Sequence, residues 1–389
     1  DLFTCPSVAA LAERAEGLPD AAATALEPRD RGEGDAPLSF GQQRLWFLHR
    51  LTPDSGQLLT HRVVRLRGAV DAPALDAAFT ALLERHEVLR TRIVRGDDGE
   101  PRQQVLPNVE FSVERRDAAG ADEALRLARE EAGRPLDPED GPLLRAVLVR
   151  ETDDAHLLLV VLHHIVSDDW SASVLAKEVG ELYAATVEGR APALPELSVQ
   201  YADFAVWERD RIRGPLLHRQ LDYWRDRLAG LDPLELPTDR QRPPRRTGAG
   251  ASVEFAVPAE VSEGLRRLAR RTGVTPFMAF LAVFQLHLAK YSGQDDVAVG
   301  VPTAGRNRAE TEDLIGFFVN TLVIRVDSSG DPTFEELLGR VREAAHGAYA
   351  HQDVPFERLV EDLAPDRDLS RTPLFQAMLT PQNLSDEVW

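Results

Sequence analysis

Six consecutive apolar residues, Leu157 to Leu162, run directly into two histidines, His163 and His164. The run is short, contains β-branched valines and has no polar residue on either face, which indicates a β-strand buried on both sides. Segments with strand and helix periodicity alternate in both halves of the chain. We therefore predict an α/β or mixed α+β architecture built around packed sheets.

Apolar spacing predicts the individual elements. Helical spacing indicates helices at 71–86, 171–183, 258–272, 276–291 and 334–349, with a helix-like apolar stripe within 38–51. Alternating or continuous apolar character indicates strands at 62–66, 156–162, 253–257, 296–301 and 321–326. In the helix at 258–272 we expect Val261, Leu265 and Leu268 to face the core.

Two segments without apolar periodicity divide the chain. Residues 17–36 are rich in Ala, Asp, Glu, Arg, Gly and Pro and read as a linker after an amphipathic helix at 2–15. Residues 236–250 form a second segment of low order, rich in Pro, Arg and Gly. The expected organisation is a fragment at 1–16, a linker at 17–36, and two halves at 37–235 and 236–389.

Composition excludes several classes of protein. The formal net charge of the 389 residues is −19, which disfavours nonspecific nucleic-acid binding. The basic cluster at 240–246 has no interleaved aromatic residue and reads as an exposed linker. With the single cysteine Cys5, no disulfide framework can form, so a reducing, cytoplasmic setting fits. No run of 18 apolar residues predicts a membrane span, and no signal peptide is expected.

The segment after the apolar run carries the candidate chemistry. Adjacent residues of an extended chain point to opposite faces, so His163 and His164 should not share one task. The two histidines could ligate zinc with Asp168, an awkward geometry for adjacent strand residues. They could instead be hydrogen-bonded core residues, or one could handle the proton of a nucleophile in acyl transfer while Asp168 fixes the loop. The motif alone leaves all three interpretations open.

Residues 163–171, HHIVSDDWS, resemble the HHxxxDGWS signature of nonribosomal peptide synthetase condensation domains. Six further segments are similar to the other motifs of that family, in the family's order: LSFGQQRLWFL at 38–48, RHEVLRT at 85–91, YADFAVW at 201–207, IGFFVNT at 315–321, HQDVPFE at 351–357 and RDLSRTPLFQ at 367–376. The resemblance thus covers residues 38–376 and is highly specific.

Both ends of the chain are also informative. Residues 1–11 resemble the last helix of a peptidyl carrier domain, whose phosphopantetheine-bearing serine is not in this chain. Condensation domains usually continue for several tens of residues past the last motif, so we expect the second lobe at 236–389 to be incomplete.

The resemblance implies a fold and a reaction. The family has two lobes like chloramphenicol acetyltransferase, arranged as a V-shaped pseudodimer with a central tunnel and the histidine motif where the lobes meet. Upstream donor and downstream acceptor carrier domains deliver thioesters on 4′-phosphopantetheine arms, the acceptor amine attacks the donor thioester, and an amide forms. The domain itself binds no cofactor or metal. An adjacent adenylation domain within a larger multidomain chain is expected, without nucleic acid or membrane.

The resemblance also assigns roles to residues. It implies His164 as the catalytic residue, which either takes the proton of the amine or orients the amine. His163 and Asp168 are structural supports, and Arg306 is the expected ionic partner of Asp168. Ser171, Trp170 and Asn320 are expected near the site, with Ser171 and Asn320 lining the tunnel.

One position departs from the family pattern, because Asp169 stands where the family usually has glycine. Glycine permits backbone geometry that other residues resist. The Asp169 carboxylate could oppose a developing oxyanion or attract the incoming ammonium group. We expect an active enzyme, since both histidines and Asp168 are present. The first motif resembles that of the subtype taking L-configured donors. The alternative is a catalytically silent scaffold that docks carrier domains or an accessory enzyme.

Overall fold

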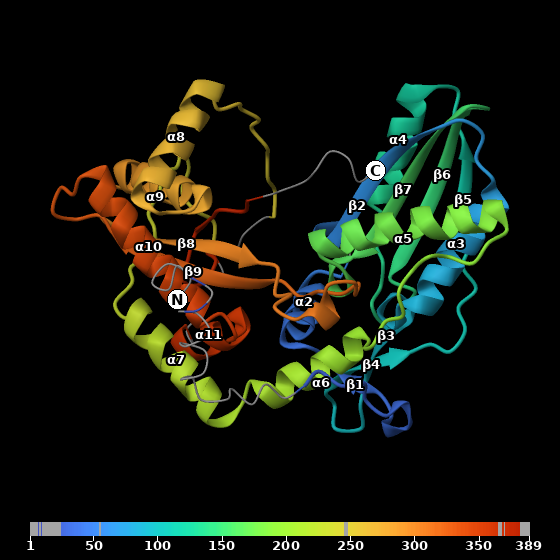
Figure 1. Cartoon of the computed structure of the whole chain (residues 1–389), viewed down its shortest axis with the longest axis horizontal. Helices are drawn as coiled ribbons and strands as arrows, with labels where there is room; N and C mark the ends of the chain where they lie inside the picture. Colours follow the sequence, from blue (N-terminus) through green and yellow to red (C-terminus); the bar gives the residue numbers. More distant parts are fainter. Residues whose placement is uncertain are drawn as a thin grey trace.

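The computed structural model describes residues 25–53, 56–244, 248–364, 368 and 370–381, together with residues 7 and 9. The remainder of the predicted helix at 2–15, Cys5, and parts of the basic cluster and of the last motif lie outside the described residues. The described chain forms two lobes, each with its own sheet and helices, which meet at the lower centre of Figure 1. A mixed α/β fold in two lobes was predicted and is confirmed.

The N-terminal lobe contains two sheets. The larger has the order β2 (Leu59–Arg67), β7 (Ala155–His163), β6 (Leu144–Thr152) and β5 (Glu114–Asp117), antiparallel except for the parallel pair of β5 and β6. The smaller has the order β1 (Ala36–Pro37), β4 (Pro101–Val105) and β3 (Thr91–Arg95). The helices of this lobe are α2 (Phe40–Leu51), α3 (Ala72–Arg85), α4 (Ala121–Ala132), α5 (Asp169–Glu188) and α6 (Tyr201–Arg211).

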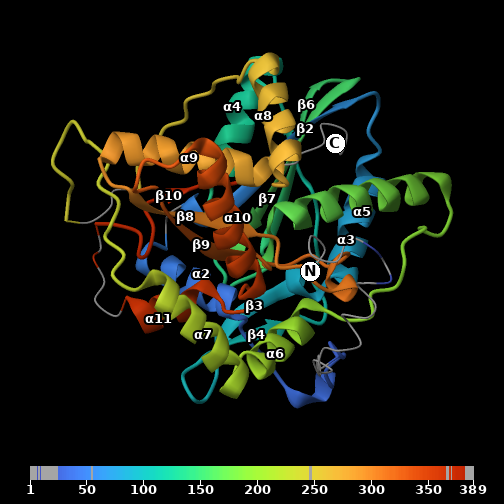
Figure 2. The ribbon, with the colours of Figure 1, turned by 60° about the vertical axis from the view of Figure 1, so that its left-hand side comes forward.

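Strand β7 lies inside the larger sheet, and both its faces are buried. Leu158, Val160 and Leu162 belong to the main core of the lobe, whereas residues 157, 159 and 161 pack in a second cluster with Ala124 of α4. Helices α3 and α5 cover one face of the sheet and α4 the other (Figure 2). The prediction of a strand buried on both sides is confirmed. Because β7 is buried on both faces, the histidines at its end are attached to a rigid element.

The C-terminal lobe is built on a sheet of order β10 (Ala377–Met378), β8 (Asp296–Thr303) and β9 (Asn320–Asp327). Its helices are α7 (Gly214–Leu228), α8 (Ala259–Thr272), α9 (Pro276–Ser292), α10 (Phe334–Ala350) and α11 (Phe356–Leu363). The loop between β8 and β9, residues 304–319, reaches across to the N-terminal lobe (Figure 1). We call it the crossing loop.

The structure corrects three expectations. The segment 253–257 forms no strand, and Val253 and Phe255 are 87% and 85% exposed, since no described strand pairs with it. Val261 is 58% exposed, whereas Leu265 and Leu268 are partly buried against the core as expected, and α8 also buries Ala269. The lobe boundary lies earlier than residue 236, because α7 packs its Trp224 into the core of the C-terminal lobe. The described residues 236–244 and 248–250 therefore belong to loops of that lobe.

The described part of the predicted linker is attached to the N-terminal lobe. Leu26 is buried in the core of that lobe, and Arg31 pairs with the buried Asp203 of α6 at 2.5 Å. Because these contacts involve isolated residues, they leave no apolar periodicity in the sequence. The sequence alone therefore predicts only a linker here.

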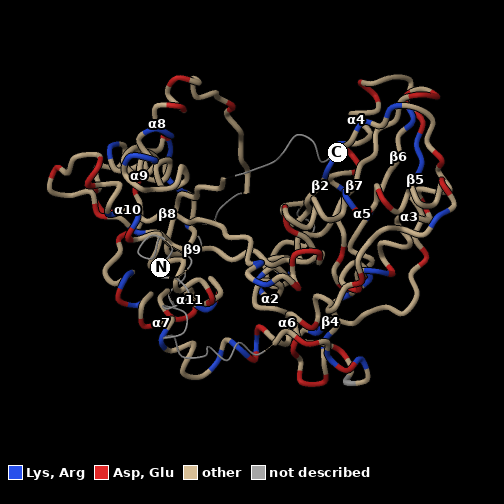
Figure 3. Tube along the Cα trace, in the orientation of Figure 1, with Lys and Arg blue, Asp and Glu red and all other residues tan. Residues whose placement is uncertain are grey.

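Acidic and basic residues are interspersed along the chain in both lobes (Figure 3). Among the described residues, no single helix is long and apolar enough to cross a membrane; α8 and α9 pass that test only as a pair bent by 110°.

Candidate active site

The histidine motif occupies the junction between β7 and α5. The strand ends at His163, a short 3₁₀ turn covers residues 164–166, and Asp168 caps α5 by accepting the backbone N–H of Ser171 at 2.7 Å. The cap holds a carboxylate at the helix N-terminus, where the helix dipole favours negative charge. This turn places the two rings in different surroundings, with His163 1% exposed and His164 partly exposed.

His163 is held in one tautomer by its backbone contact. Its Nδ1 accepts the N–H of Ile165 at 3.1 Å, so in the neutral ring the proton resides on Nε2. That Nε2 is buried without a hydrogen-bond partner among the described residues, and the ring meets His49 edge-on at 5.5 Å between centroids. Burial, with smaller contributions from His49 and His164, lowers the pKa of His163 from 6.5 to about 3. His163 is therefore neutral at physiological pH.

His164 is held in the opposite tautomer. Its Nδ1 lies 2.6 Å from the backbone oxygen of Ser167, which can only accept, so Nδ1 donates and Nε2 carries a free lone pair in the neutral ring. The ring packs edge-on against Phe317 of the crossing loop, with centroids 5.1 Å apart. A neutral imidazole that presents Nε2 can accept a proton or a hydrogen bond from an amine.

Asp168 and Arg306 form the ion pair that the resemblance implied. Nη2 of Arg306 donates to Oδ1 of Asp168 at 3.2 Å, and both side chains are 1% exposed. Nη1 of Arg306 donates to the carbonyls of Thr311 and Leu314, the latter at 2.7 Å. The second oxygen of Asp168 accepts the backbone N–H of Phe318 at 3.0 Å. The pair therefore fastens the crossing loop of one lobe to the histidine motif of the other.

Ser171 belongs to the same junction. We expected it to line the tunnel, but it is not among the residues that line the cavity between the lobes. It is 1% exposed, and its hydroxyl contacts Asp168, the Arg306 guanidinium and both the N–H and the carbonyl of Gly316 at 2.7–3.0 Å. The polar side chain is buried because the helix terminus and the crossing loop supply all its partners.

Asn320 lines a cavity between the two lobes, described below, but its polar atoms bind backbone groups. Its amide donates to the carbonyls of Gln352 and Val354, and its oxygen accepts from Thr321 and Phe356, all at 2.8–2.9 Å. Asn320 therefore shapes the segment before α11.

Asp169 is the first residue of α5 and has ordinary helical geometry. Among the described non-glycine residues, only Asp331 and Leu374 have positive φ. The carboxylate is 59% exposed and pairs with Arg62 of β2 at 2.9 Å. The backbone here does not need the conformational freedom of glycine, and the charge is matched by a cation. Trp170 is 46% exposed and donates its Nε1 to the carbonyl of Glu312 at 2.8 Å.

A second contact between the N-terminal lobe and the crossing loop was not predicted from the sequence. His86 of the second motif contacts Glu178 of α5 at 2.7 Å through Nε2, and its Nδ1 accepts the N–H of Ile315 at 3.4 Å. Its ring and the carboxylate are both nearly fully buried. No local pattern reveals a contact between residues so distant in the chain.

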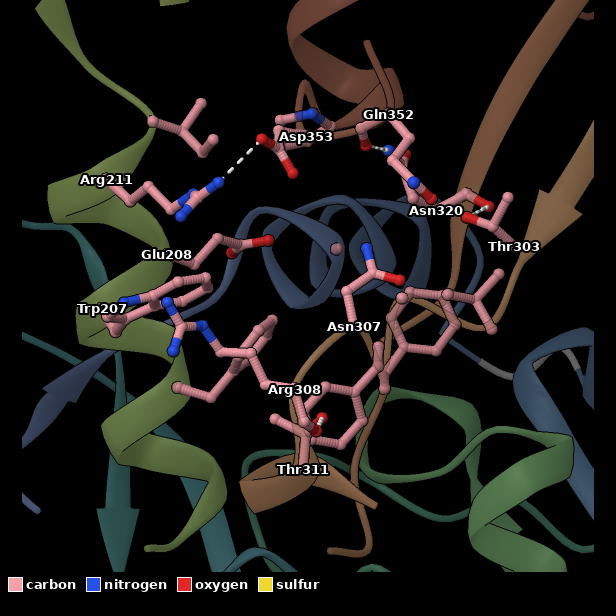
Figure 4. A pocket seen from close by; sticks show the side chains of 18 of the residues that line it. Trp207, Glu208, Arg211, Thr303, Asn307, Arg308, Thr311, Asn320, Gln352 and Asp353 are labelled. Atoms are coloured by element: carbon pink, nitrogen blue, oxygen red, sulfur yellow. Dashed lines mark hydrogen bonds and ion pairs between the residues drawn. The ribbon is translucent and has the colours of Figure 1, made fainter. Parts of the chain in front are cut away.

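A cavity of about 390 Å³ lies where α6, the crossing loop and the segment before α11 meet (Figure 4). Phe317 lines it and also touches His164, so one aromatic ring adjoins both. Arg211 of α6 pairs with Asp353 at 2.9 Å across the lobe junction. Glu208 points towards the middle of the cavity (Figure 4). Sequence reasoning did not single out Glu208 or Arg211.

The donor atoms of the motif argue against the zinc interpretation. Nδ1 of each histidine and both Asp168 oxygens are engaged by protein groups. Among the described residues, no three His, Cys, Asp or Glu side chains are grouped closely enough to hold a metal ion.

Comparisons with known proteins agree with this geometry. The sequence matches the family model of the condensation domain over residues 32–388. It is 48% identical over 392 residues to one of the linear gramicidin synthase subunits of Brevibacillus parabrevis, covering 98% of this chain and 8% of that protein. Phosphinothricin tripeptide synthetase PhsC of Streptomyces viridochromogenes is 42% identical over 369 residues, covering 93% of this chain and 34% of that protein. The chain thus spans 5–8% of the three linear gramicidin synthase subunits that it matches.

Solved structures share the fold. The X-domain from teicoplanin biosynthesis aligns with a TM-score of 0.83 at 32% identity, over 91% of this chain and 79% of that chain. The first condensation domain of the calcium-dependent antibiotic synthetase, in complex with a substrate analogue, aligns with a TM-score of 0.72 at 22% identity, over 89% and 79%. These neighbours confirm the expected chloramphenicol acetyltransferase-like pseudodimer. With a family match over most of its length, this chain belongs to the condensation-domain family of nonribosomal peptide synthetases.

Proposed function

We propose that the domain forms an amide bond between two thioester-bound substrates, with His164 as the catalytic residue. The acceptor α-amine attacks the donor thioester carbonyl, the new C–N bond forms, the C–S bond breaks, and the donor arm leaves as a thiol that gains a proton while the amine loses one. The carrying observation is the tautomer of His164, whose Nδ1 is bound to the Ser167 carbonyl so that Nε2 is the accepting atom.

The remaining motif residues would position this imidazole. A free α-amine has a reference pKa of about 7.7–8.0, so a useful fraction is neutral at pH 7 and a strong base is not required. His164 would orient that amine and receive its proton as the bond forms. Neutral His163 and the Asp168–Arg306 pair would fix the turn and the crossing loop around it. No serine or cysteine nucleophile is needed, because a thioester is already activated.

The substrates would arrive on 4′-phosphopantetheine arms of an upstream donor and a downstream acceptor carrier domain, through a tunnel between the lobes. We further propose an L-configured donor, from the first motif, and a carrier-domain helix at residues 1–16. The domain would act inside a larger cytoplasmic synthetase beside an adenylation domain, as the multidomain relatives suggest. Neither monomer is specified by these features.

Single-turnover experiments test this proposal. Donor and acceptor carriers are loaded with aminoacyl groups, and the dipeptidyl product is quantified for wild type, His164→Ala, and the matched control His218→Ala at an exposed position on α7. Product from wild type and from the control, but not from His164→Ala, is expected. Equal product from His164→Ala would refute the role of this imidazole.

The second candidate is a silent scaffold that recruits another protein. One observation favours it: at 31% identity and a TM-score of 0.84, the chain is similar to an X-domain solved in a complex with OxyB from teicoplanin biosynthesis. The intact histidine motif favours the enzyme. If neither the wild type nor Asp169→Gly forms product with any loaded pair, the scaffold is the better description.

A further inference from the structure

The inter-lobe cavity combines aromatic walls with a single unmatched acid. Its lining includes Phe204, Trp207, Phe317 and Phe318, and its volume of about 390 Å³ falls within the range of small-ligand sites. Glu208 projects from α6 towards its centre (Figure 4). Apolar walls around one convergent charged group are the arrangement typical of a binding site.

The charges of the wall do not balance. Glu208 accepts only the backbone N–H of Phe40, at 2.9 Å, and has no ion-pair partner among the described residues. The other acids of the wall are each paired with an arginine: Asp353 with Arg211 at 2.9 Å, Glu357 with Arg44 at 3.2 Å, and Glu310 with Arg308 at 3.9 Å. Glu208 is therefore the one acid among the described lining residues that lacks a paired arginine, although the charge of Arg209, which donates to Leu38 and Gln43, favours its ionised form.

Burial has the opposite effect on Glu208. Burial is the main cause that raises the pKa of Glu208 to about 7, with Glu357 adding to the rise and the Phe40 N–H and Arg209 opposing it. An acid in this condition is stabilised in its charged form when a cation comes beside it.

The cavity adjoins the reacting centre through one side chain. The backbone on both sides of Phe317 is fixed, because Ser171 binds Gly316 and Asp168 binds the N–H of Phe318. The carbonyl of Phe317 itself accepts the hydroxyl of Tyr201 at 2.6 Å. The Phe317 ring, carried on this fixed backbone, lines the cavity and also contacts the His164 ring.

We propose that this cavity binds the ammonium group of a basic amino-acid side chain carried by one of the two thioester substrates, with Glu208 as its counter-ion. The aromatic side chains enclose the methylene chain, and Phe317 turns aside to admit it. This inference rests on the amide-forming function proposed above.

The experiment compares lysyl with norleucyl substrates, which share an unbranched side chain but differ in charge. One arm varies the acceptor and the other the donor, with single-turnover rates measured over a range of loaded-carrier concentration. In one arm, wild type is expected to prefer the lysyl substrate by about tenfold in apparent KM, which corresponds to about 1.4 kcal/mol. Glu208→Gln is expected to abolish the preference. Glu361→Gln, at an exposed site on α11, is the matched control and retains it.

The preference should also depend on pH. Lysine keeps its charge below a pKa of about 10.4, whereas Glu208 ionises near pH 7, so the preference grows between about pH 6 and pH 8 in wild type and stays flat in Glu208→Gln. The charged groups around Glu208 are Arg209 and Arg211 on its own helix, Arg308 and Glu310 on the crossing loop, and Asp353, Glu357 and its partner Arg44.

Each outcome has a distinct meaning. A preference confined to one arm supports the subsite and assigns it to the acceptor or the donor. Norleucyl product without any lysyl preference in wild type overturns the subsite and leaves amide formation intact, whereas no product from any pair overturns the proposed function itself. If Glu208→Gln does not fold, Gln352→Glu adds a second acid to the same wall and must strengthen the lysyl preference; a fall would overturn the proposal.

Discussion

The buried neutral state of His163 predicts a defined loss of stability at mildly acidic pH. Its folded pKa of about 3 lies below the ordinary value of 6.5, so the unfolded state binds the proton more readily. The stabilisation is complete above pH 6.5 and is lost as the pH falls from 6.5 towards 3. Between about pH 7.5 and about pH 5.5, proton linkage gives a loss of about 1.4 kcal/mol in the free energy of unfolding.

His163→Asn isolates this effect. The asparagine oxygen can replace Nδ1 as acceptor for the Ile165 N–H, but the side chain does not titrate. The smaller side chain costs stability equally at both pH values. The difference in unfolding free energy between wild type and variant should therefore shrink by about 1.4 kcal/mol at the lower pH, while all other titrating groups cancel.

Urea denaturation of both proteins at the two pH values measures this difference, and the lower value stays above the sequence pI of about 5.0. Titration of the His163 ring protons by NMR gives the folded pKa independently. A difference that does not change with pH, or a folded His163 that titrates near 6.5, would refute the reasoning. Either result would mean that the ring is hydrated or shares its proton with His49.

Three further predictions concern the motif. His164→Ala should lower the single-turnover rate by about 10²–10⁴-fold, the usual contribution of general acid–base catalysis. Asp169→Gly should lower the free energy of unfolding by about 1 kcal/mol, because glycine weakens a helix terminus and the ion pair with Arg62 is lost. The same change should alter the single-turnover rate less than tenfold. A much faster variant would show that the native aspartate impairs catalysis. Arg306→Met should cost about 3–5 kcal/mol in denaturant unfolding by leaving Asp168 buried and unpaired. The double variant with Asp168→Asn should recover part of that loss, and no recovery would argue against the pair.

The sequence predicts those parts of the fold whose pattern is local. The apolar run of β7 and the helical spacing of α9 and α10 report burial directly, and all three elements are confirmed. The alternation at 253–257 has the same local form, yet a strand exists only where a neighbour supplies hydrogen bonds, and no described strand does so. Pattern alone could not reveal that missing partner.

The residues of the candidate site also divide into those that the sequence predicts and those that it does not. The Asp168–Arg306 pair was foreseen through family resemblance, because 138 residues separate its members and no spacing rule links them. Ser171 was expected to line the tunnel, because its place at the end of the motif is visible in the sequence whereas its contacts with Gly316 are not. Glu208 went unnoticed since its burial depends on two lobes meeting.

One short segment carries both the His164 imidazole and the two residues, Asp168 and Ser171, that bind the crossing loop of the other lobe. Asp168 and Ser171, at the start of α5, bind the backbone of Phe318 and Gly316, so they grip the crossing loop on either side of Phe317. Phe317 in turn packs against His164 at the other end of the same turn. Any shift of one lobe against the other must therefore move the ring that touches His164, or break a buried charge-assisted contact. The position of the His164 ring is therefore coupled to the contact between the lobes. Mutations of Asp168 or Ser171 should change the rate as well as the stability.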